Sequence, residues 1–553
     1  MGYYVIAVGG TGNKILESVV YGACADVFYT QNECGKHEPL PLIHALSVDV
    51  DAACGNTTRA KRAAEHYEEI RQAFAASPHK HRCFHTALQL SRWSMGLDKR
   101  AASVDGMVQN HLSDQVLSRT LFSKTESSLE YSEGFRGHPD LGVLFFAELL
   151  NALEEPQIRL QPDELLDFID DMQADLHKGE TVKVILCGSI FGGTGASGIP
   201  ALSQYLHKRF AEDHEHFEMA SMLMLPYYEV PKATQNEEQE IVVSSAAFID
   251  KARTALQYYG MSGLMRDGAN DPSGVFDALY LLGLPPESFV TTRNYATGSQ
   301  SQENDAHLLE WLATRCLSKF FRTGFRGQDA RNIDCYYYQW HSPTLSWQSF
   351  DLESDLYRVQ YGALLKAAAV FFAECYPTLR LRVSAAHSQS KRVNYCAPYF
   401  YRVGRYPMSE RAKLEKHLNS LYQFFAFYCN WLIQIIRTLP PTLREGESAA
   451  ISSQNDLPQN SLLCAELLGE LSRLLHEYGT TAALRDHALF DSACLALQKG
   501  LQRLVTHRVP DRRNLAYVIA ALGGSTCDAK NADAALCGFL GTLLQAVAEE
   551  EVQ

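Results

Sequence analysis

The chain has 553 residues of ordinary globular composition, 46% hydrophobic and 21% charged, which excludes a fibrous or wholly disordered protein. At about 150 residues per domain, this length predicts three or four domains. The formal net charge of −14 argues against direct nucleic-acid binding and against a polybasic membrane anchor. The 14 cysteines form no CxxC pair and the first residues lack a signal-peptide pattern, so we expect a cytoplasmic protein with reduced thiols.

The most hydrophobic stretch of the chain lies at residues 422–436. It contains Gln423, Asn430 and Gln434, and it is shorter than the roughly 20 apolar residues that a membrane-spanning helix needs. We therefore interpret this stretch as a buried helix and expect no membrane span.

Four potential metal ligands alternate in one short segment, as His79, His81, Cys83 and His85. In an extended segment they would share one side, which is an arrangement that a metal site can use. Basic residues lie between them, however, and no second group of ligands accompanies them. These features favour a solvated loop, and we predict no metal-binding residues.

Short apolar stretches alternate with helical patterns over the first 320 residues or so. Strands are predicted at residues 3–8, 42–48, 182–187, 218–225 and 278–282, and the clearest helices at 13–27 and 199–209. This alternation predicts an α/β fold with a mostly parallel sheet covered by helices on both faces. Ligands of such folds bind at the carboxyl ends of the strands.

The remaining segments carry a different pattern. Residues 52–131 lack a strand pattern and are rich in charge and histidine, so we expect a helical insertion there. Beyond about residue 354 the chain becomes mainly helical, and the proline-containing stretch 440–458 is the clearest internal boundary. The helices are predicted at residues 356–374, 410–437, 461–476 and 531–549.

Three glycine-rich turns carry the sharpest functional signal, at residues 9–13, 134–142 and 188–198. Glycine permits close backbone approach, so that successive N–H groups can converge on phosphate oxygens at the start of a helix. The chain has no GxxxxGK[ST] motif, and the first turn is GGxG, without the GxGxxG order of a dinucleotide site. The spacing thus disfavours a dinucleotide-dependent oxidoreductase and favours a phosphate cradle built from three separate loops.

These motifs resemble those of the tubulin and FtsZ superfamily of GTPases. Residues 192–198 are similar to the family's GGGTG[ST]G signature, and residues 9–13 resemble its first nucleotide loop. Four further motifs follow the family's pattern: Ser47-Val48-Asp49, the Gly-His-Pro-Asp-Leu-Gly of residues 137–142, Pro226-Tyr227-Tyr228-Glu229, and the Asn304-Asp305 that opens a long apolar helix. All six occur in the family's order over about 320 residues.

The resemblance implies a Rossmann-like tubulin/FtsZ-type domain over residues 1–325 that binds GTP or GDP together with Mg²⁺. ATP stays open, because Asn304 and Asp305 match by position alone and are also typical helix caps. The residues that the resemblance places on the nucleotide are Gly9, Gly10, Thr11, Gly12, Asn13, Asp49, Gly137, His138, Gly192, Gly193, Thr194, Gly195, Ala196, Ser197, Glu229, Asn304 and Asp305.

In this superfamily, an acidic residue from the next subunit completes the catalytic site from a loop after the central helix. Asn332-Ile333-Asp334 stands in the corresponding region, so the resemblance favours Asp334 as the catalytic residue. Asp329 lies nearby, and Asp351, which precedes the next helix, also competes for the role.

The second half of the chain departs from the family. Residues 326–440 contain one strand-like stretch, 394–403, where the family has a small sheet domain, and residues 441–553 read as a helical C-terminal domain. Two functions therefore stay open. The first is an assembly-dependent GTPase that forms head-to-tail filaments by self-association. The second is a catalytically weak nucleotide-binding switch or structural module that binds a protein partner through its helical C-terminal region.

Overall fold

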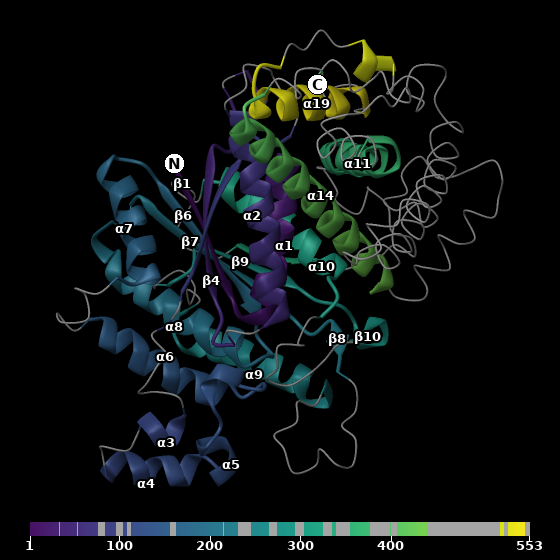
Figure 1. Cartoon of the computed structure of the whole chain (residues 1–553). Helices are drawn as coiled ribbons and strands as arrows, with labels where there is room; N and C mark the ends of the chain where they lie inside the picture. Colours follow the sequence, from purple (N-terminus) through teal and green to yellow (C-terminus); the bar gives the residue numbers. More distant parts are fainter. Residues whose placement is uncertain are drawn as a thin grey trace.

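A sheet of seven parallel strands organises the fold, in the order β11-β9-β7-β6-β1-β4-β5 (Figure 1). The central strand β1 pairs on one side with β6, where Val5 lies beside Ile185, and on the other with β4, where Val5 lies beside Ala45. The strands are β1 (Gly2–Val8), β4 (Leu42–Val48), β5 (Ala87–Arg92), β6 (Val182–Ser189), β7 (Phe217–Met224), β9 (Ala278–Leu282) and β11 (Asp334–Tyr338).

The computed structural model describes most of the first 325 residues and part of the remainder. The described residues are 1–32, 34–51, 54–75, 83–93, 95, 103–107, 112–154, 162–213, 215–230, 245–264, 274–292, 304–324, 334–338, 354–375, 399, 406–438, 520–524 and 529–547.

Helices cover both faces of the sheet, which Figure 1 shows nearly edge-on. One layer contains α1 (Gly9–Cys24), α2 (Gly55–Ala75) and α10 (Leu308–Arg322), and the other contains α6 (Pro139–Leu153), α7 (Glu164–His177) and α8 (Thr194–Arg209). Because both faces are covered, every residue of β1, β6 and β7 is buried, and these strands are correspondingly apolar.

Smaller elements surround this core. The short helices α3, α4 and α5 project below the carboxyl edge of the sheet in Figure 1, and α9 lies beside that edge. The bounds are α3 (Val104–Met107), α4 (Leu112–Leu121), α5 (Lys124–Ser127) and α9 (Phe248–Met261), with the antiparallel pair β2 (Tyr29–Gln31) and β3 (His37–Pro39) and the parallel pair β8 (Tyr228–Glu229) and β10 (Val290–Thr291).

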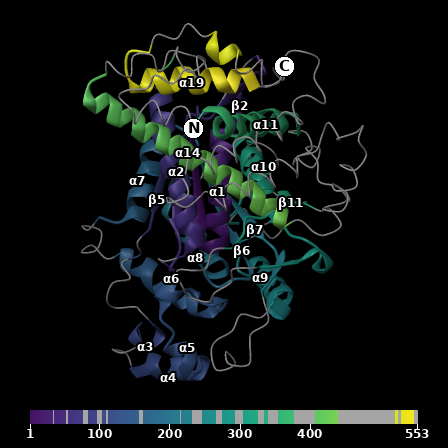
Figure 2. The same cartoon turned by 45° about the vertical axis from the view of Figure 1, so that its right-hand side comes forward.

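An outer layer of helices from the second half of the chain packs on α1 and α2 (Figure 2). It contains α11 (Ser354–Val370), α14 (Met408–Arg437) and α19 (Ala532–Val547). The Trp431 ring of α14 lies 4.8 Å from the ring of Tyr21 and 5.1 Å from that of Trp311. His417 of α14 is buried between two carboxylates, with ring nitrogens 3.1 Å from Glu69 and 2.8 Å from Asp533. The outer layer thereby joins the core of the sheet domain.

The predicted fold class is confirmed, since a parallel α/β sheet is followed by a helical region. Residues 52–131 differ from expectation: they contain the edge strand β5, and α2 belongs to the helix layer that packs on α1. Residues 356–374, 410–437 and 531–549 contain helices as predicted. The helix at 461–476, the boundary at 440–458 and, apart from Tyr399, the strand-like stretch 394–403 lie outside the described residues. The division at residues 325 and 440 stays a prediction.

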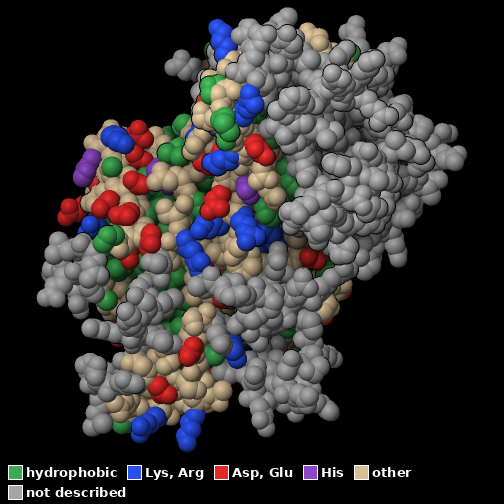
Figure 3. All heavy atoms as spheres, viewed as in Figure 1, with side chains coloured by type: hydrophobic (Ala, Val, Ile, Leu, Met, Phe, Trp, Pro, Cys, Tyr) green, Lys and Arg blue, Asp and Glu red, His purple; other side chains and the backbone are tan. Residues whose placement is uncertain are grey.

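The surface agrees with the acidic composition. Figure 3 shows acidic side chains gathered over α7, with basic side chains nearer the middle of the same face. Among the helices that the structure describes, none combines the length and the hydrophobicity needed to cross a membrane. The apolar stretch at 422–436 lies within α14, as the predicted buried helix.

We expect Trp431→Ala to lower the free energy of unfolding by about 3–5 kcal/mol, because it opens a cavity between α14, α1 and α10. Urea unfolding measures this change. Met408→Ala, at the exposed start of the same helix, is the control and should change stability by less than about 0.5 kcal/mol. Equal small effects of the two substitutions would contradict the packing of α14 on the sheet domain.

Candidate functional site

A cavity lies at the carboxyl ends of β1, β4 and β6, where the three glycine-rich turns meet. Its space is about 870 Å³, including the part that opens to solvent. The predicted site residues that line it are Gly9, Gly10, Thr11, Asp49, Gly137, Gly192, Gly193, Thr194, Gly195 and Asn304. Phe135, Arg136, Ser189 and Tyr228 also line it and lie within the predicted motifs, although they were not predicted as contacts. Sequence reasoning missed Lys14, Asp51, Cys54 and Asn56 as lining residues.

Two long helices begin at this cavity. The helix α1 starts directly after β1, at Gly9, whose φ of +73° favours glycine, and α8 starts at Thr194. A Cβ on Gly12 would lie 2.8 Å from the carbonyl carbon of Ala7 and 2.6 Å from the carbonyl oxygen of Cys187. Only glycine therefore lets α1 lie this close to the sheet. The first N–H groups of both helices lack partners within the helix, so the cavity receives two positive helix termini.

The second turn packs directly against the third. Gly134, Arg136 and Gly137 all adopt positive φ, and a Cβ on Gly193 would lie 2.7 Å from the Cβ of Phe135. The half-buried Lys251 of α9 donates to the carbonyl oxygen of Gly137 at 2.7 Å, and burial lowers the pKa of this lysine. The three turns thus form one continuous wall.

Several predicted nucleotide-binding residues support this wall without lining the cavity. Asn13 donates to the carbonyl of Gly9 at 3.0 Å and accepts from Ser47 at 2.6 Å, which fixes the first turn to β4. Ser197 donates to the carbonyl of Gly193 at 2.9 Å. The other predicted residues that do not line the cavity are Gly12, His138, Ala196, Glu229 and Asp305.

Two of these residues lie in different surroundings. Glu229 is exposed on β8, and Asp305 lines a smaller neighbouring cavity together with Lys14, His307 and Thr438. Both remain predicted nucleotide contacts, although the described cavity does not include them.

Two carboxylates follow β4 and face the glycine turns. Asp49 and Asp51 are buried, and Asp49 accepts hydrogen bonds from the Asp51 N–H at 3.3 Å and from the Thr57 hydroxyl at 3.4 Å. Burial, followed by the charge of Asp51, raises the pKa of Asp49 to about 7. Such a pair offers the hard oxygen ligands that Mg²⁺ prefers, so the residues present fit this ion.

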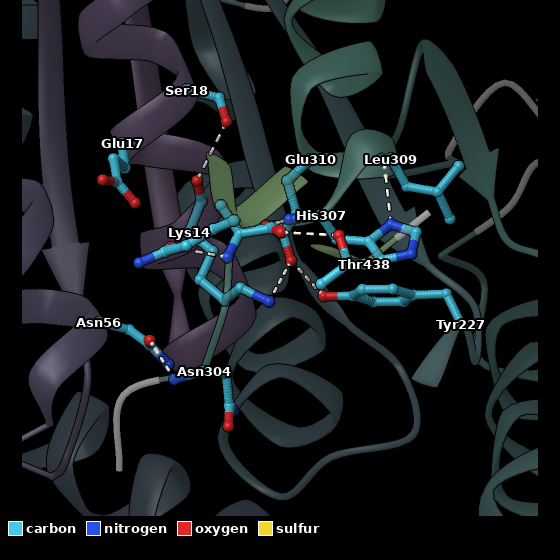
Figure 4. Close-up of polar contacts among 12 residues, drawn as sticks. Lys14, Glu17, Ser18, Asn56, Tyr227, Asn304, His307, Leu309, Glu310 and Thr438 are labelled. Carbon is cyan, nitrogen blue, oxygen red and sulfur yellow. Dashed lines mark hydrogen bonds and ion pairs between the residues drawn. The ribbon is translucent and has the colours of Figure 1, made fainter. Parts of the chain in front are cut away.

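Asn304 carries a buried hydrogen-bond acceptor into the cavity. Its backbone N–H donates to Asn56 Oδ1 at 3.0 Å (Figure 4). Its carbonyl accepts from Arg59 at 3.1 Å, and the two bonds fix the residue. The side-chain Oδ1 has no hydrogen-bond donor among the described residues. An unpaired buried acceptor is costly, so this oxygen suits a donor on a ligand.

Lys14 was missed by the sequence reasoning, because the chain has no GxxxxGK[ST] motif to indicate a phosphate-binding lysine. This residue of α1 lines the cavity and is 4% exposed, and its Nζ lies 2.5 Å from Glu310 Oε1. The only local signal is its position in the first half of the helix, directly after the Gly9–Asn13 turn. Its partner lies in a distant segment that no local pattern reveals.

The predicted catalytic residues lie away from the cavity of their own chain or outside the described residues. Asp334 is the first residue of β11 and pairs with Ala278, the first residue of β9, so it lies at the amino edge of the parallel sheet. The glycine turns follow the opposite, carboxyl edge. Asp329 and Asp351 lie outside the described residues.

Glycine turns at the carboxyl ends of a parallel sheet place this chain among the Rossmann-like α/β proteins. Residues 4–265 match the family model described as "Tubulin like". This match supports the tubulin/FtsZ-like assignment that the motifs indicated, and the family suggests nucleotide binding in general. The match includes the three glycine turns and ends before Asn304 and Asp334. No curated protein matches the sequence.

The raised pKa of Asp49 predicts a pH-dependent stability. Between its ordinary value of 3.8 and about 7, the native state binds more protons than the unfolded state. The free energy of unfolding should therefore fall as the pH rises through this window, by up to about 4 kcal/mol. Asp49→Asn removes this titration, so the variant should gain stability relative to the wild type from pH 4 to pH 8.

Urea unfolding at a series of pH values measures this difference. Asp250→Asn removes a carboxylate that is 77% exposed on α9 and serves as the control. Parallel stability curves for wild type and Asp49→Asn would show that Asp49 does not titrate in this window.

Proposed function

We propose that this protein binds GTP and hydrolyses it in an assembly-dependent manner, as head-to-tail filaments form. The observation that carries the proposal is the convergence of two helix N-termini and three glycine turns on one cavity, beside Asp49 and Asp51. Backbone N–H groups and helix termini of this kind bind phosphate without needing a lysine. A nucleoside triphosphate is the ligand class that best matches such a cavity in a tubulin-like fold.

The carboxylates have a distinct role in this proposal. Asp49 and Asp51 would hold Mg²⁺, which neutralises phosphate charge when it is bound. In a chain with a net charge of −14, two buried carboxylates beside a polyphosphate would otherwise repel it. The cavity wall itself contributes the helix termini and the backbone N–H groups of the glycine turns.

Asn304 supports guanine as the base. Its buried Oδ1 needs a donor, and the Watson–Crick edge of guanine presents two adjacent donors, N1–H and N2–H₂. Adenine presents one donor, its N6 amino group, on that edge. The base identity is therefore an outcome that the first experiment below decides.

The opposite positions of Asp334 and the cavity support hydrolysis across a subunit contact. The helix α10 begins at Leu308, shortly after the cavity residue Asn304, and runs to the amino edge of the sheet, where Lys183 donates to the carbonyl of Phe320 at 3.2 Å. In a head-to-tail stack, the amino edge of one copy meets the carboxyl edge of the next. Asp334 of one copy would then orient the attacking water in the cavity of its neighbour. A contact of this type that does not close on itself produces a filament.

One observation favours the second candidate function, a catalytically weak nucleotide switch that acts through its helical region. The C-terminal end of α14 bonds to the segment before α10: Gln434 accepts from the Ala306 N–H at 2.9 Å, and Thr438 donates to the Ala306 carbonyl at 2.9 Å. A movement of the segment before α10, caused by a ligand in the cavity, would thus be transmitted to α14 through these hydrogen bonds. Nucleotide binding without turnover or polymer formation would favour this function.

We expect the purified protein to release a guanine nucleotide, identified by chromatography.

A second expectation concerns Gly10, where an added Cβ would meet its nearest atom at 3.5 Å, an ordinary van der Waals contact. Gly10→Asp adds a negative charge to the phosphate cavity and should weaken GTP binding about 100-fold or more. Gly10→Asn, of the same size and neutral, should change the affinity by less than about 10-fold. Equal losses for both variants would indicate a steric effect and not a phosphate site.

We expect turnover to rise more than linearly with protein concentration, and Asp334→Asn to reduce it about 100-fold or more while GTP binding persists. Mixing Asp334→Asn with Gly10→Asp should restore turnover, because one copy supplies an intact cavity and the other an intact Asp334. Asp250→Asn is the matched control. A strictly linear, slow rate without polymers would contradict the filament proposal, and full turnover of Asp334→Asn would move the role to Asp329 or Asp351.

A further inference from the structure

Lys14 is a cation that lines the phosphate cavity, but its amine forms an ion pair with a residue of another helix. Its side chain lines the cavity beside Gly10 and Thr11, but its amine is paired with Glu310 of α10 at 2.5 Å. The two side chains are 4% and 0% exposed, so water screens this pair very little. Figure 4 shows the pair between α1 and the first turn of α10.

Glu310 also organises the start of α10. Its Oε1 accepts the Tyr227 hydroxyl at 2.6 Å, and its Oε2 accepts the His307 N–H at 2.8 Å, which completes a capping box. His307 is neutral, because burial and the charge of Lys14 lower its pKa to about 3, and its Nδ1 accepts the Leu309 N–H at 3.1 Å. Lys14 is therefore the cation that neutralises Glu310.

A second buried ion pair lies near the amino edge of the sheet. Lys183 of β6 lies 2.8 Å from Glu218 of β7, and the two side chains are 3% and 5% exposed. Neither of these residues lines the phosphate cavity. The second pair thus matches the first in burial and charge but not in position.

We propose that a polyphosphate ligand and Glu310 compete for Lys14, so that the Lys14–Glu310 pair is a latch on α10 that the ligand opens. The inference rests on the proposed phosphate site. Several negative charges in the cavity attract the Lys14 amine and repel Glu310, and the flexible stem of lysine lets the amine move between them. Opening the latch leaves Glu310 without its cation and changes the first turn of α10, next to the Ala306 contacts of α14.

Competition predicts effects of opposite sign for the two partners. Glu310→Gln removes the competitor and should tighten binding of GTP and of tripolyphosphate about 10-fold, whereas Lys14→Met should weaken both about 10-fold or more. The double variant Lys14→Met/Glu310→Gln replaces the pair by neutral groups of similar size and guards against misfolding. It should match Lys14→Met in affinity. Isothermal titration calorimetry measures these constants.

The second ion pair supplies the control. Lys183→Met and Glu218→Gln should each change the affinity less than about 3-fold, because this pair is distant from the cavity and its effect is on packing. Hydrogen exchange adds a readout of the latch itself. Tripolyphosphate should speed exchange of the His307 and Leu309 amides in the wild type but not in the double variant.

The outcomes separate this inference from the proposed function. Weaker binding by both Glu310→Gln and Lys14→Met would make the pair structural and would overturn the latch while GTP binding stands. Opposite effects with tripolyphosphate, without GTP binding by the wild type, would support the latch and reject the nucleotide. If the wild type binds neither probe, both proposals are rejected.

Discussion

The structure depends on how closely two helices approach the ends of the sheet. A Cβ on Gly12 would collide with the backbone of β1 and β6, and a Cβ on Gly188 would lie 2.6 Å from the carbonyl oxygen of Val8. A Cβ on Gly195 would collide with the backbone of Ser189. These three positions make α1 and α8 begin at the same point of the carboxyl edge. The cavity, its helix termini and the order of the turns around it all follow from this packing.

Charge imposes the second constraint on the molecule. A chain with a net charge of −14 that binds a polyanion has to offset its own carboxylates locally. Backbone dipoles achieve this without adding side-chain charge, while Lys14 is paired internally and Asp49 is held close to neutrality by burial. Changes in the charge of these few groups should therefore alter the site strongly.

Much of the fold was predictable because its signals are local. Five strands appeared as apolar runs, and the glycine turns are contiguous motifs at the ends of those runs. The edge strand β5 was missed because polar residues such as Gln89 and Ser91 interrupt its apolar residues. As an edge strand it pairs with β4 on one side only, so it can be less apolar than the central strands. The Lys14–Glu310 pair could not be predicted, since it joins residues from the first and the tenth helix. Asn304 was found by resemblance, but only the three-dimensional structure reveals that its side-chain oxygen lacks a hydrogen-bond donor.

The packing of Trp431 against Tyr21 and Trp311 bears on how the chain folds. These contacts join the first helix to a helix some 400 residues later, so the core has a high contact order, which is typical of slow folding. During synthesis, the sheet and its first helices emerge well before α14. Until then, Tyr21 and Trp311 would present an exposed apolar face, and a fragment ending near residue 325 would retain that face permanently. The α/β part is thus made first, and this apolar face is covered only when the helical half of the chain follows.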